Sequence, residues 1–325
     1  MSESSSPQCP LCRASAHFYA RSNDRFYPEL PGTFNLFRCA FCEAIFIFPI
    51  PSREELAAHY PVGYGPHEES SAAYAPKRGL RAWMERGALA RWLGYSTSSF
   101  VQALAYPYFL RIAYYPRFKE NGRILDVGCG SGRFLLAMRH FGWRETVGTD
   151  TSPEAVGRAK KHSLDVRLGA LEELDLPSHS FDAITLHHVF EHFADPEAKL
   201  AELRRILKPN GELIVTVPNT QSFSARIFGK NWFGLEIPRH LINYNRKNLS
   251  SLVEKAGFKI VSMRTPKLFA TFLGSLGYAT QNPPAFSPRT LLFVHRGITT
   301  LEIILDPAFS FLGLGDEIIL RTRPR

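Results

Sequence analysis

Between residues 121 and 265, short apolar runs alternate regularly with amphipathic segments. The runs at 123–128, 145–150, 165–170, 181–188 and 211–219 predict five buried strands. The segments at 132–142, 152–163 and 195–211 carry apolar residues at helical spacing and predict three helices between those strands. Strands alternating with helices are typical of an α/β fold, here a doubly wound and mostly parallel sheet.

Local residue choices support these helix boundaries. Ser152 and Asp195 stand at N-cap positions, and Pro153 occupies the first helical position of its segment. Pro209 and Gly211 predict the end of the helix that begins after Asp195.

A glycine-rich loop follows the first predicted strand. Gly128, Gly130 and Gly132 lie where such a fold binds ligands, at the carboxyl end of a strand and before a helix N-terminus. Asp150 ends the second strand, where a carboxylate can accept hydrogen bonds from a ribose diol. Arg133 occupies the last glycine position of a dinucleotide fingerprint. These features predict a nucleoside-bearing ligand other than a dinucleotide.

The stretch "LDVGCGSG" at 125–132 resembles motif I of class I S-adenosylmethionine-dependent methyltransferases. The resemblance covers about residues 120–265 and includes "SFDAITLHHVFEHFADP" at 180–196 and "LRRILKPNGELIVTVPN" at 203–219. It implies a Rossmann-like methyltransferase sheet with an antiparallel last strand.

The resemblance also implies a cofactor site for S-adenosylmethionine. Asp126 and the loop 128–132 would hold the methionyl part, Asp150 the ribose, and the segment 169–174 the adenine. Relatives commonly have an acid where Ala170 stands, so adenine recognition is expected from backbone groups near Leu171. The candidate cofactor-binding residues are Asp126, Gly128, Cys129, Gly130, Gly132, Asp150, Ala170, Leu171 and His187, of which Cys129 is also expected to be a packing residue.

Three residues are candidates for the chemical step. Glu191 and His192 resemble the Glu-His pair of ubiquinone-biosynthesis-type O-methyltransferases, in which His192 would remove a hydroxyl proton and Glu191 would orient its ring. His240 lies in a segment similar to the family's loop over the acceptor and is a second candidate base, and Asn219 could also face the acceptor. The alternative for both histidines is a purely structural role.

Four cysteines near the start of the sequence form two CxxC knuckles. Cys9 and Cys12 are followed by Cys39 and Cys42, a pattern typical of a closed structural Zn²⁺ site. Two disulfides or an iron–sulfur cluster are the alternatives. The arrangement resembles bacterial methyltransferases that join a Cys₄ ribbon to the methyltransferase fold, among them sugar and cell-surface glycan modifiers.

The sequence therefore divides into a zinc ribbon (1–50), a helical linker or cap (51–120) and a methyltransferase domain (121–325) with an apolar insertion at about 268–312. The basic and apolar segment 77–95 and the insertion predict either a packed helical cap or peripheral contact with a membrane.

Charge and composition narrow the partners. A net charge of +9 permits an anionic partner, but the ribbon is aromatic and apolar rather than densely basic, which disfavours nucleic acid. The sequence shows no secretory leader and no apolar run of 18 residues. We therefore expect a cytoplasmic protein, and the alternative is one that also contacts the inner membrane from that side.

The sequence as a whole predicts an S-adenosylmethionine-dependent methyltransferase that O-methylates a small molecule, a sugar or a lipid-linked glycan. The alternatives are an RNA methyltransferase and a non-catalytic binding module that keeps the cofactor fold.

Overall fold

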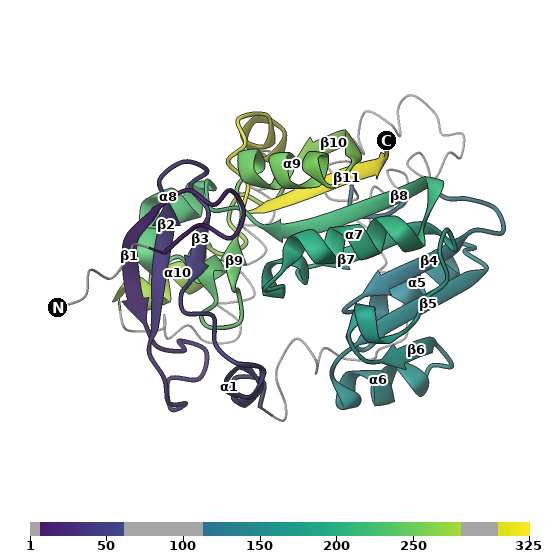
Figure 1. Ribbon diagram of the computed structural model, residues 1–325, viewed down its shortest axis with the longest axis horizontal. Coiled ribbons are helices and arrows are strands. Elements are labelled where there is room, and N and C mark those ends of the chain that lie inside the picture. Colours follow the sequence, from purple (N-terminus) through teal and green to yellow (C-terminus); the bar gives the residue numbers. More distant parts are fainter. Residues whose placement is uncertain (1–6, 62–112, 281–304) are drawn as a thin grey trace.

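The computed structural model of the protein describes residues 7–61, 113–280 and 305–325 (Figure 1). These residues form two sheets. A seven-stranded sheet has the order β10-β11-β8-β7-β4-β5-β6, and a four-stranded sheet has the order β1-β2-β3-β9. The larger sheet carries the candidate cofactor residues at the carboxyl ends of its parallel strands.

The larger sheet confirms the predicted α/β fold. Strands β4 to β8 pair in parallel, and β11 runs antiparallel between β8 and β10. The expectation of an antiparallel last strand is therefore confirmed. The strands are β4 (Arg123–Val127), β5 (Glu145–Asp150), β6 (Asp165–Leu168), β7 (Phe181–His187), β8 (Leu207–Pro218), β10 (Phe258–Arg264) and β11 (Glu317–Pro324).

The helices begin where the sequence predicts. The Ser152 and Asp195 side chains accept hydrogen bonds from the N–H groups of Ala155 and Ala198, as N-caps do. One boundary was wrong: the helix after Asp195 ends before Pro209, because the chain turns directly into β8. The helices are α5 (Arg133–His140), α6 (Pro153–Lys160), α7 (Pro196–Ile206), α8 (Phe223–Phe228), α9 (Arg246–Lys255) and α10 (Phe272–Thr280).

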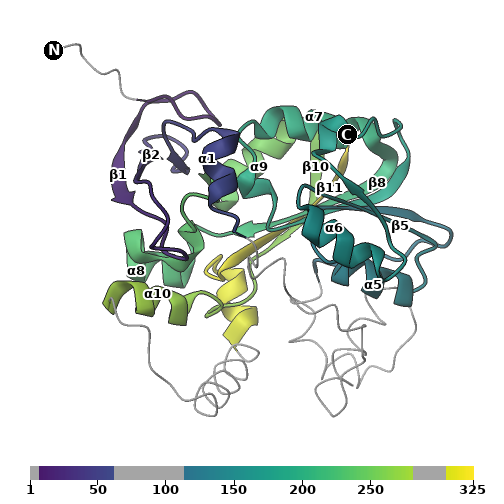
Figure 2. The same ribbon diagram turned by 90° about the horizontal axis from the view of Figure 1, so that it is seen from below.

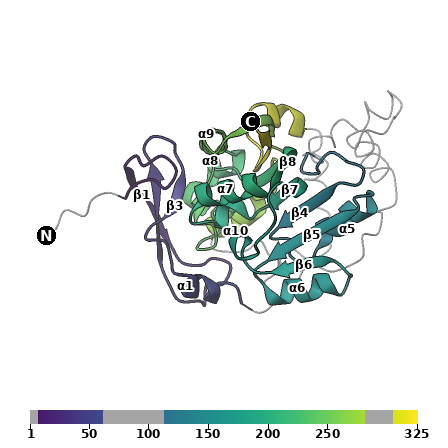
Figure 3. The same cartoon turned by 45° about the vertical axis from the view of Figure 1, so that its right-hand side comes forward.

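The ribbon is joined to the rest of the molecule by a shared strand. It consists of β1 (Ala16–Ser22), β2 (Phe34–Cys39) and β3 (Ile45–Ile47), followed by α1 (Arg53–Ala58). β3 pairs with β9 (Ile242–Asn243), which comes from the segment after β8. We call residues 7–61 the N-terminal unit, and Figures 1 and 3 show it beside the larger sheet.

One hydrophobic core extends through both sheets. It contains Leu36 and Ile47 of the ribbon, Leu241 beside β9, and Ile184 and Leu213 of the larger sheet. The ribbon therefore shares a hydrophobic core with the larger sheet and does not form a separate core of its own.

The two segments predicted to contact a membrane are only partly described. Residues 77–95 lie outside the described residues, and of 268–312 the structure describes 268–280 and 305–312. Figure 2 shows α10 of this insertion beside α8. No helix within the described ranges is long and apolar enough to cross a bilayer.

Candidate active site

The glycine loop after β4 adopts backbone conformations that are unfavourable for residues with a side chain. Gly128, Gly130 and Gly132 have φ angles of +69°, +54° and +83°. A Cβ at Gly128 would lie 2.4 Å from a methyl group of Val189, and one at Gly132 would lie 2.2 Å from Leu164. The loop therefore requires glycine for both its conformation and its packing.

Asp150 ties this loop to the end of β5. Its carboxylate accepts hydrogen bonds from the N–H of Gly130 and the N–H of Ser152, both at 2.8 Å. The side chain is mostly buried. A carboxylate has about four lone-pair sites, so two remain for a ligand's hydroxyl groups.

Asp126 and Cys129 lie deeper than the loop glycines. Asp126 is buried and accepts a hydrogen bond of 2.7 Å from the Thr185 hydroxyl; burial raises the pKa of its carboxyl to about 7, against the effect of that bond. The Cys129 sulfur would contact a Cβ placed at Gly148 at 2.6 Å, so it fills the space beside β5. Burial raises the pKa of this thiol, which favours packing over reactivity.

His187 ends β7 and has a polar atom without a partner. Its Nε2 atom is buried and has no hydrogen bond among the described residues, while Nδ1 lies 3.4 Å from the Thr216 hydroxyl. The ring packs edge-to-face against Phe134, with centroids 4.6 Å apart. Burial lowers the pKa of His187 to about 3, so the imidazole is neutral.

The segment expected to flank adenine is a short 3-10 turn, Leu171–Glu173. Leu171 is buried, and the N–H of Ala170 donates to the Glu173 carboxylate at 2.9 Å. Asn219 does not face an open site: it is fully buried, and its amide donates to the carbonyls of Gly313 and Gly315.

His192 lies between two backbone carbonyl oxygens. Nδ1 is 2.8 Å from the carbonyl of Arg239 and 3.2 Å from the Tyr60 hydroxyl, and Nε2 is 3.2 Å from the carbonyl of His188. Because a carbonyl only accepts, the shortest contact assigns the proton of the neutral ring to Nδ1. Nε2 then carries the lone pair that a general base needs.

Glu191 does not orient His192, contrary to the sequence-based expectation. Its side chain is fully buried, and both oxygens lack a hydrogen bond within the described part of the chain. Its Oε1 instead lies 3.5 Å from His188 Nδ1 and 3.7 Å from His240 Nε2. The physical reason is the short turn Phe190–His192, which directs the two neighbouring side chains to different partners.

His240 is buried beside His192. Its Nδ1 lies 2.9 Å from the carbonyl of Gly234, and the two histidine rings are 4.9 Å apart at a steep angle. His240 is only 5% exposed. As placed, it supports His192 and has little surface to offer an acceptor.

His188 is a site residue that the sequence did not single out for chemistry. Its ring lies between Glu191 and Glu317, with nitrogen–oxygen distances of 3.5 Å and 3.3 Å, and its φ is +54°. Burial would lower its pKa, but the two carboxylates outweigh it and raise the pKa to about 10. Glu317 comes from β11, so only the folded topology brings it to His188.

Within the described parts of the chain, two groups of side chains have the composition of metal sites. Glu191, His192 and His240 place one ligand atom each within 4.8 Å of one another, but both His192 nitrogens already face carbonyl oxygens. A metal there would have to displace one of these contacts.

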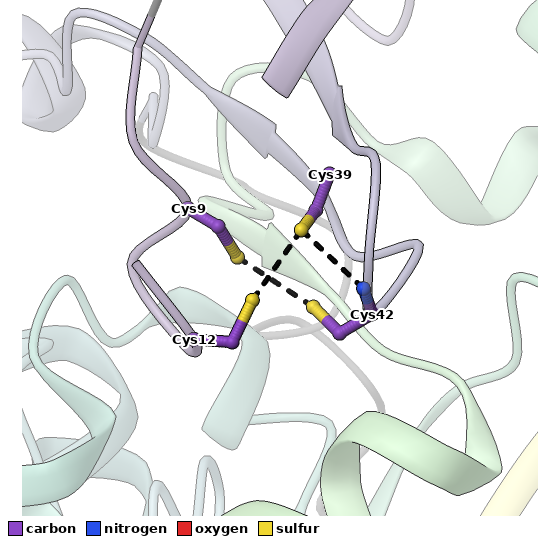
Figure 4. A group of neighbouring side chains, drawn as sticks. All are labelled: Cys9, Cys12, Cys39 and Cys42. Carbon is purple, nitrogen blue, oxygen red and sulfur yellow. Dashed lines mark hydrogen bonds between the residues drawn. The ribbon is translucent and has the colours of Figure 1, made fainter. Parts of the chain in front are cut away.

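The four ribbon cysteines have no such competing contacts (Figure 4). The sulfur atoms of Cys9 and Cys42 are 3.6 Å apart, those of Cys12 and Cys39 are 3.4 Å apart, and all four lie within 4.8 Å. None forms a disulfide. Zn–S bonds of about 2.3 Å in a tetrahedron place sulfurs about 3.8 Å apart, so the cluster fits a metal ion.

A hollow of about 660 Å³ lies away from these residues. It is bounded by α7, α9 and the end of β11, near His179 and Leu207, where β7 and β8 begin. The site described above therefore lies at the other edge of the sheet, around the carboxyl ends of the parallel strands.

A doubly wound sheet with a glycine loop after its first strand and an acid after its second defines a nucleoside-binding class of α/β protein. Residues 98–263, about half of the chain, match the family described as methyltransferase domain. The chain belongs to this family.

Relatives in two bacteria carry the name ubiquinone biosynthesis O-methyltransferase. The protein of Cereibacter sphaeroides is 32% identical over 157 residues, which cover 45% of this chain and 63% of the relative. That of Xanthomonas oryzae pv. oryzae is 34% identical over 133 residues, which cover 38% of this chain and 55% of the relative. This chain thus spans less than two thirds of the length of either relative.

The crystal structure of the [4+2]-cyclase SpnF shares the fold. It superposes with a TM-score of 0.51 at 18% sequence identity, covering 84% of this chain and 96% of that one. A protein named as a cyclase on the same fold illustrates that fold alone does not determine a reaction.

Proposed function

We propose that the protein transfers a methyl group from S-adenosylmethionine to a hydroxyl group of a small molecule. The observation that carries this proposal is the pairing of a glycine loop, closed by Asp150, with a histidine whose Nε2 lone pair is available near the same sheet edge. Family membership and the names of the bacterial relatives support it.

The residues around the loop fit the methyl donor. Asp126, the loop 128–132, Asp150 and the backbone near Ala170 and Leu171 would hold it. The buried Nε2 of His187, which has no hydrogen-bond partner among the described residues, favours such a ligand. When bound, S-adenosylmethionine supplies an electrophilic methyl group on a sulfonium.

His192 would act as the general base. The acceptor's hydroxyl proton moves to Nε2 as its oxygen gains the methyl group, while Nδ1–H stays bonded to the Arg239 carbonyl. The new Nε2–H can then donate to the His188 carbonyl, 3.2 Å away, which stabilises the imidazolium. Glu191 adds a buried negative charge nearby. Alignment of the acceptor supplies the rest of the catalysis.

We infer that the four cysteines bind one structural Zn²⁺. A closed set of four thiolates leaves no open position for an acceptor, so the metal would stabilise the ribbon. Three backbone N–H groups donate to these sulfur atoms, that of Leu11 to Cys9 and those of Phe41 and Cys42 to Cys39, as is usual around a metal thiolate.

We propose that the reaction takes place in the cytoplasm. The names of the relatives favour a phenolic or quinol acceptor. Sugars and lipid-linked glycans form the second acceptor group, for which residues 77–95 and 268–312 would contact a membrane surface.

The test is a donor-consumption screen. The protein is incubated with S-adenosylmethionine and catechol, quinol precursors, nucleotide sugars, lipid-linked sugars or RNA, and S-adenosylhomocysteine and methylated products are quantified by mass spectrometry. We expect an O-methylated small molecule. Methylated RNA, with binding that weakens steeply with salt, would favour the alternative suggested by the +9 charge. Donor binding without any product would indicate a binding module.

A further inference from the structure

A buried ion pair joins the N-terminal unit to the segment that contacts His192. Asp24 follows β1, and Arg239 precedes β9; both side chains are fully buried. The guanidinium binds the carboxylate through two hydrogen bonds, of 2.7 Å and 3.0 Å. Such a planar, two-bonded pair fixes orientation as well as distance.

The N-terminal unit holds Arg239 from several sides. Arg239 also donates to the backbone carbonyl of His59 at 2.8 Å and stacks over the rings of Phe26 and Tyr27. Asp24 is itself fixed, because it accepts hydrogen bonds from the N–H groups of Phe26 and Tyr27. Outside the unit, Glu236 accepts a bond of 3.0 Å from Arg239 Nε.

The contacts that set the His192 ring depend on this arrangement. Its Nδ1 faces the backbone carbonyl of Arg239 at 2.8 Å and the hydroxyl of Tyr60 at 3.2 Å. Tyr60 belongs to the N-terminal unit, and Arg239 is anchored to it. The N-terminal unit therefore supplies one partner of Nδ1, the Tyr60 hydroxyl, and anchors the residue that carries the other, Arg239.

We propose that Asp24 and Tyr60 are positioning residues for methyl transfer, which fix His192 with its proton on Nδ1 and its lone pair on Nε2. The inference rests on the proposed function. If the Arg239 carbonyl shifted, the ring could instead place its proton on Nε2 and donate to His188. The nitrogen assigned as the base would then be blocked.

Stability alone is a weak explanation for this pair. Burying two charges costs solvation that their attraction barely offsets, and apolar residues of similar size often stabilise a core as well. Orientation of a neighbouring catalytic group is a role that apolar residues could not fill.

The experiment compares Asp24→Asn and Tyr60→Phe with the full-length wild type. Arg25→Gln is the matched control, because it breaks a 3.2 Å bond between the N-terminal unit and the carbonyl of Lys230 without touching Arg239. The readouts are the ¹⁵N NMR signals of the His192 ring, assigned by their loss in His192→Ala, the affinity for S-adenosylmethionine, and kcat and KM with catechol.

We expect the wild-type ring to be protonated on Nδ1 and the Asp24→Asn ring to shift toward Nε2. With catechol, kcat should fall about 100-fold in Asp24→Asn and about 3- to 10-fold in Tyr60→Phe, the scale of a charged and a neutral hydrogen bond. Donor affinity should stay within about 2-fold, and Arg25→Gln should behave as wild type. If Asp24→Asn does not fold, Asp24→Asn/Arg239→Met removes both charges and tests the same shift.

An unchanged ¹⁵N signal of the His192 ring in folded variants would overturn the inference, whatever values of kcat and KM are measured with catechol. If methyl transfer occurs but the ring and kcat do not respond, only the positioning role fails. If the ring responds and no acceptor of the panel is methylated, the proposed function fails and the positioning of His192 stands.

Discussion

At the scale of single residues, backbone carbonyl groups contact both nitrogens of the His192 ring and fix its orientation. It lies 2.8 Å from the carbonyl of Arg239 and 3.2 Å from that of His188, so each protonation state finds an acceptor. Glu191, the carboxylate next to it in sequence, instead directs its Oε1 atom at His188 and His240. If His192 is the general base that we propose, it can gain a proton without reorganising its surroundings.

His192→Ala should reduce turnover by about 10²- to 10⁴-fold, the usual contribution of a general base. Burial lowers the pKa of His192, so the neutral form persists below the ordinary histidine value of about 6.5, and the acidic limb of kcat should lie below that pH. His17→Ala, on the exposed surface of β1, is the control. An unchanged pH–rate profile in His192→Ala would contradict the assignment.

Asp150→Ala should weaken binding of S-adenosylmethionine by about 1–3 kcal/mol, because it removes a charged acceptor and frees the N–H groups of Gly130 and Ser152. Calorimetric titration measures this change. Asp165→Ala, an exposed acid at the start of β6, should leave the affinity unchanged.

At the scale of elements, the pairing of β3 with β9 links the cysteine ribbon to the segment that contacts His192. Asn245 and Asn248, which begin α9, both donate side-chain hydrogen bonds to the carbonyl of Cys42, at 2.9 Å and 3.2 Å. We therefore expect a change at the cysteines to affect β9 and the segment that carries Arg239 and His240.

Cys39→Ser should remove the single zinc ion that we propose and expose the backbone of β2, β3 and β9 to hydrogen exchange. Turnover should fall, while affinity for the methyl donor stays near wild type, because the donor loop lies on β4 and β5. Phe18→Ala, on the ribbon surface, is the control. Metal analysis that finds no zinc in wild-type protein prepared under reducing conditions would refute the metal assignment.

Local patterns predicted the parallel strands β4 to β8 and the helices between them, since strand runs, N-caps and the glycine loop are properties of adjacent residues. They did not predict β10 and β11, and the antiparallel last strand was expected only from the family resemblance. The spacing of the four cysteines was also sufficient to predict their cluster. The partners Asp24–Arg239 and His188–Glu317 were beyond prediction, because each joins residues that are distant in sequence and meet only through sheet topology. The role of Ala170 and Leu171 in adenine recognition stays a prediction.

At the scale of the whole molecule, ionic contacts join segments that are far apart in the sequence. His188 joins the end of β7 to Glu317 of β11, and Glu317 also binds Lys267 at 2.5 Å. Arg239 and Asp24 continue this pattern to the N-terminal unit. In each of these contacts a buried carboxylate has a cationic partner, which keeps the carboxylate ionised inside the protein.

The pH dependence of stability should reveal His188. Its pKa is raised to about 10, so it binds its proton more tightly folded than unfolded. Its contribution is therefore fully present below about pH 6.5 and is lost as the pH rises through about 10. Thermal unfolding should show this loss in wild type and a flatter profile in His188→Gln. The half-exposed ring keeps the effect smaller than the pKa shift alone implies.

We propose that the loop after β4 binds S-adenosylmethionine, and calorimetric titration of wild type and Gly130→Val is the decisive experiment. Gly130 has a φ of +54°, which a β-branched side chain strongly resists. We expect one bound S-adenosylmethionine per wild-type chain and no measurable binding to a Gly130→Val protein that keeps its fold by circular dichroism. Equal affinity in the two proteins, or no binding to wild type, would contradict it.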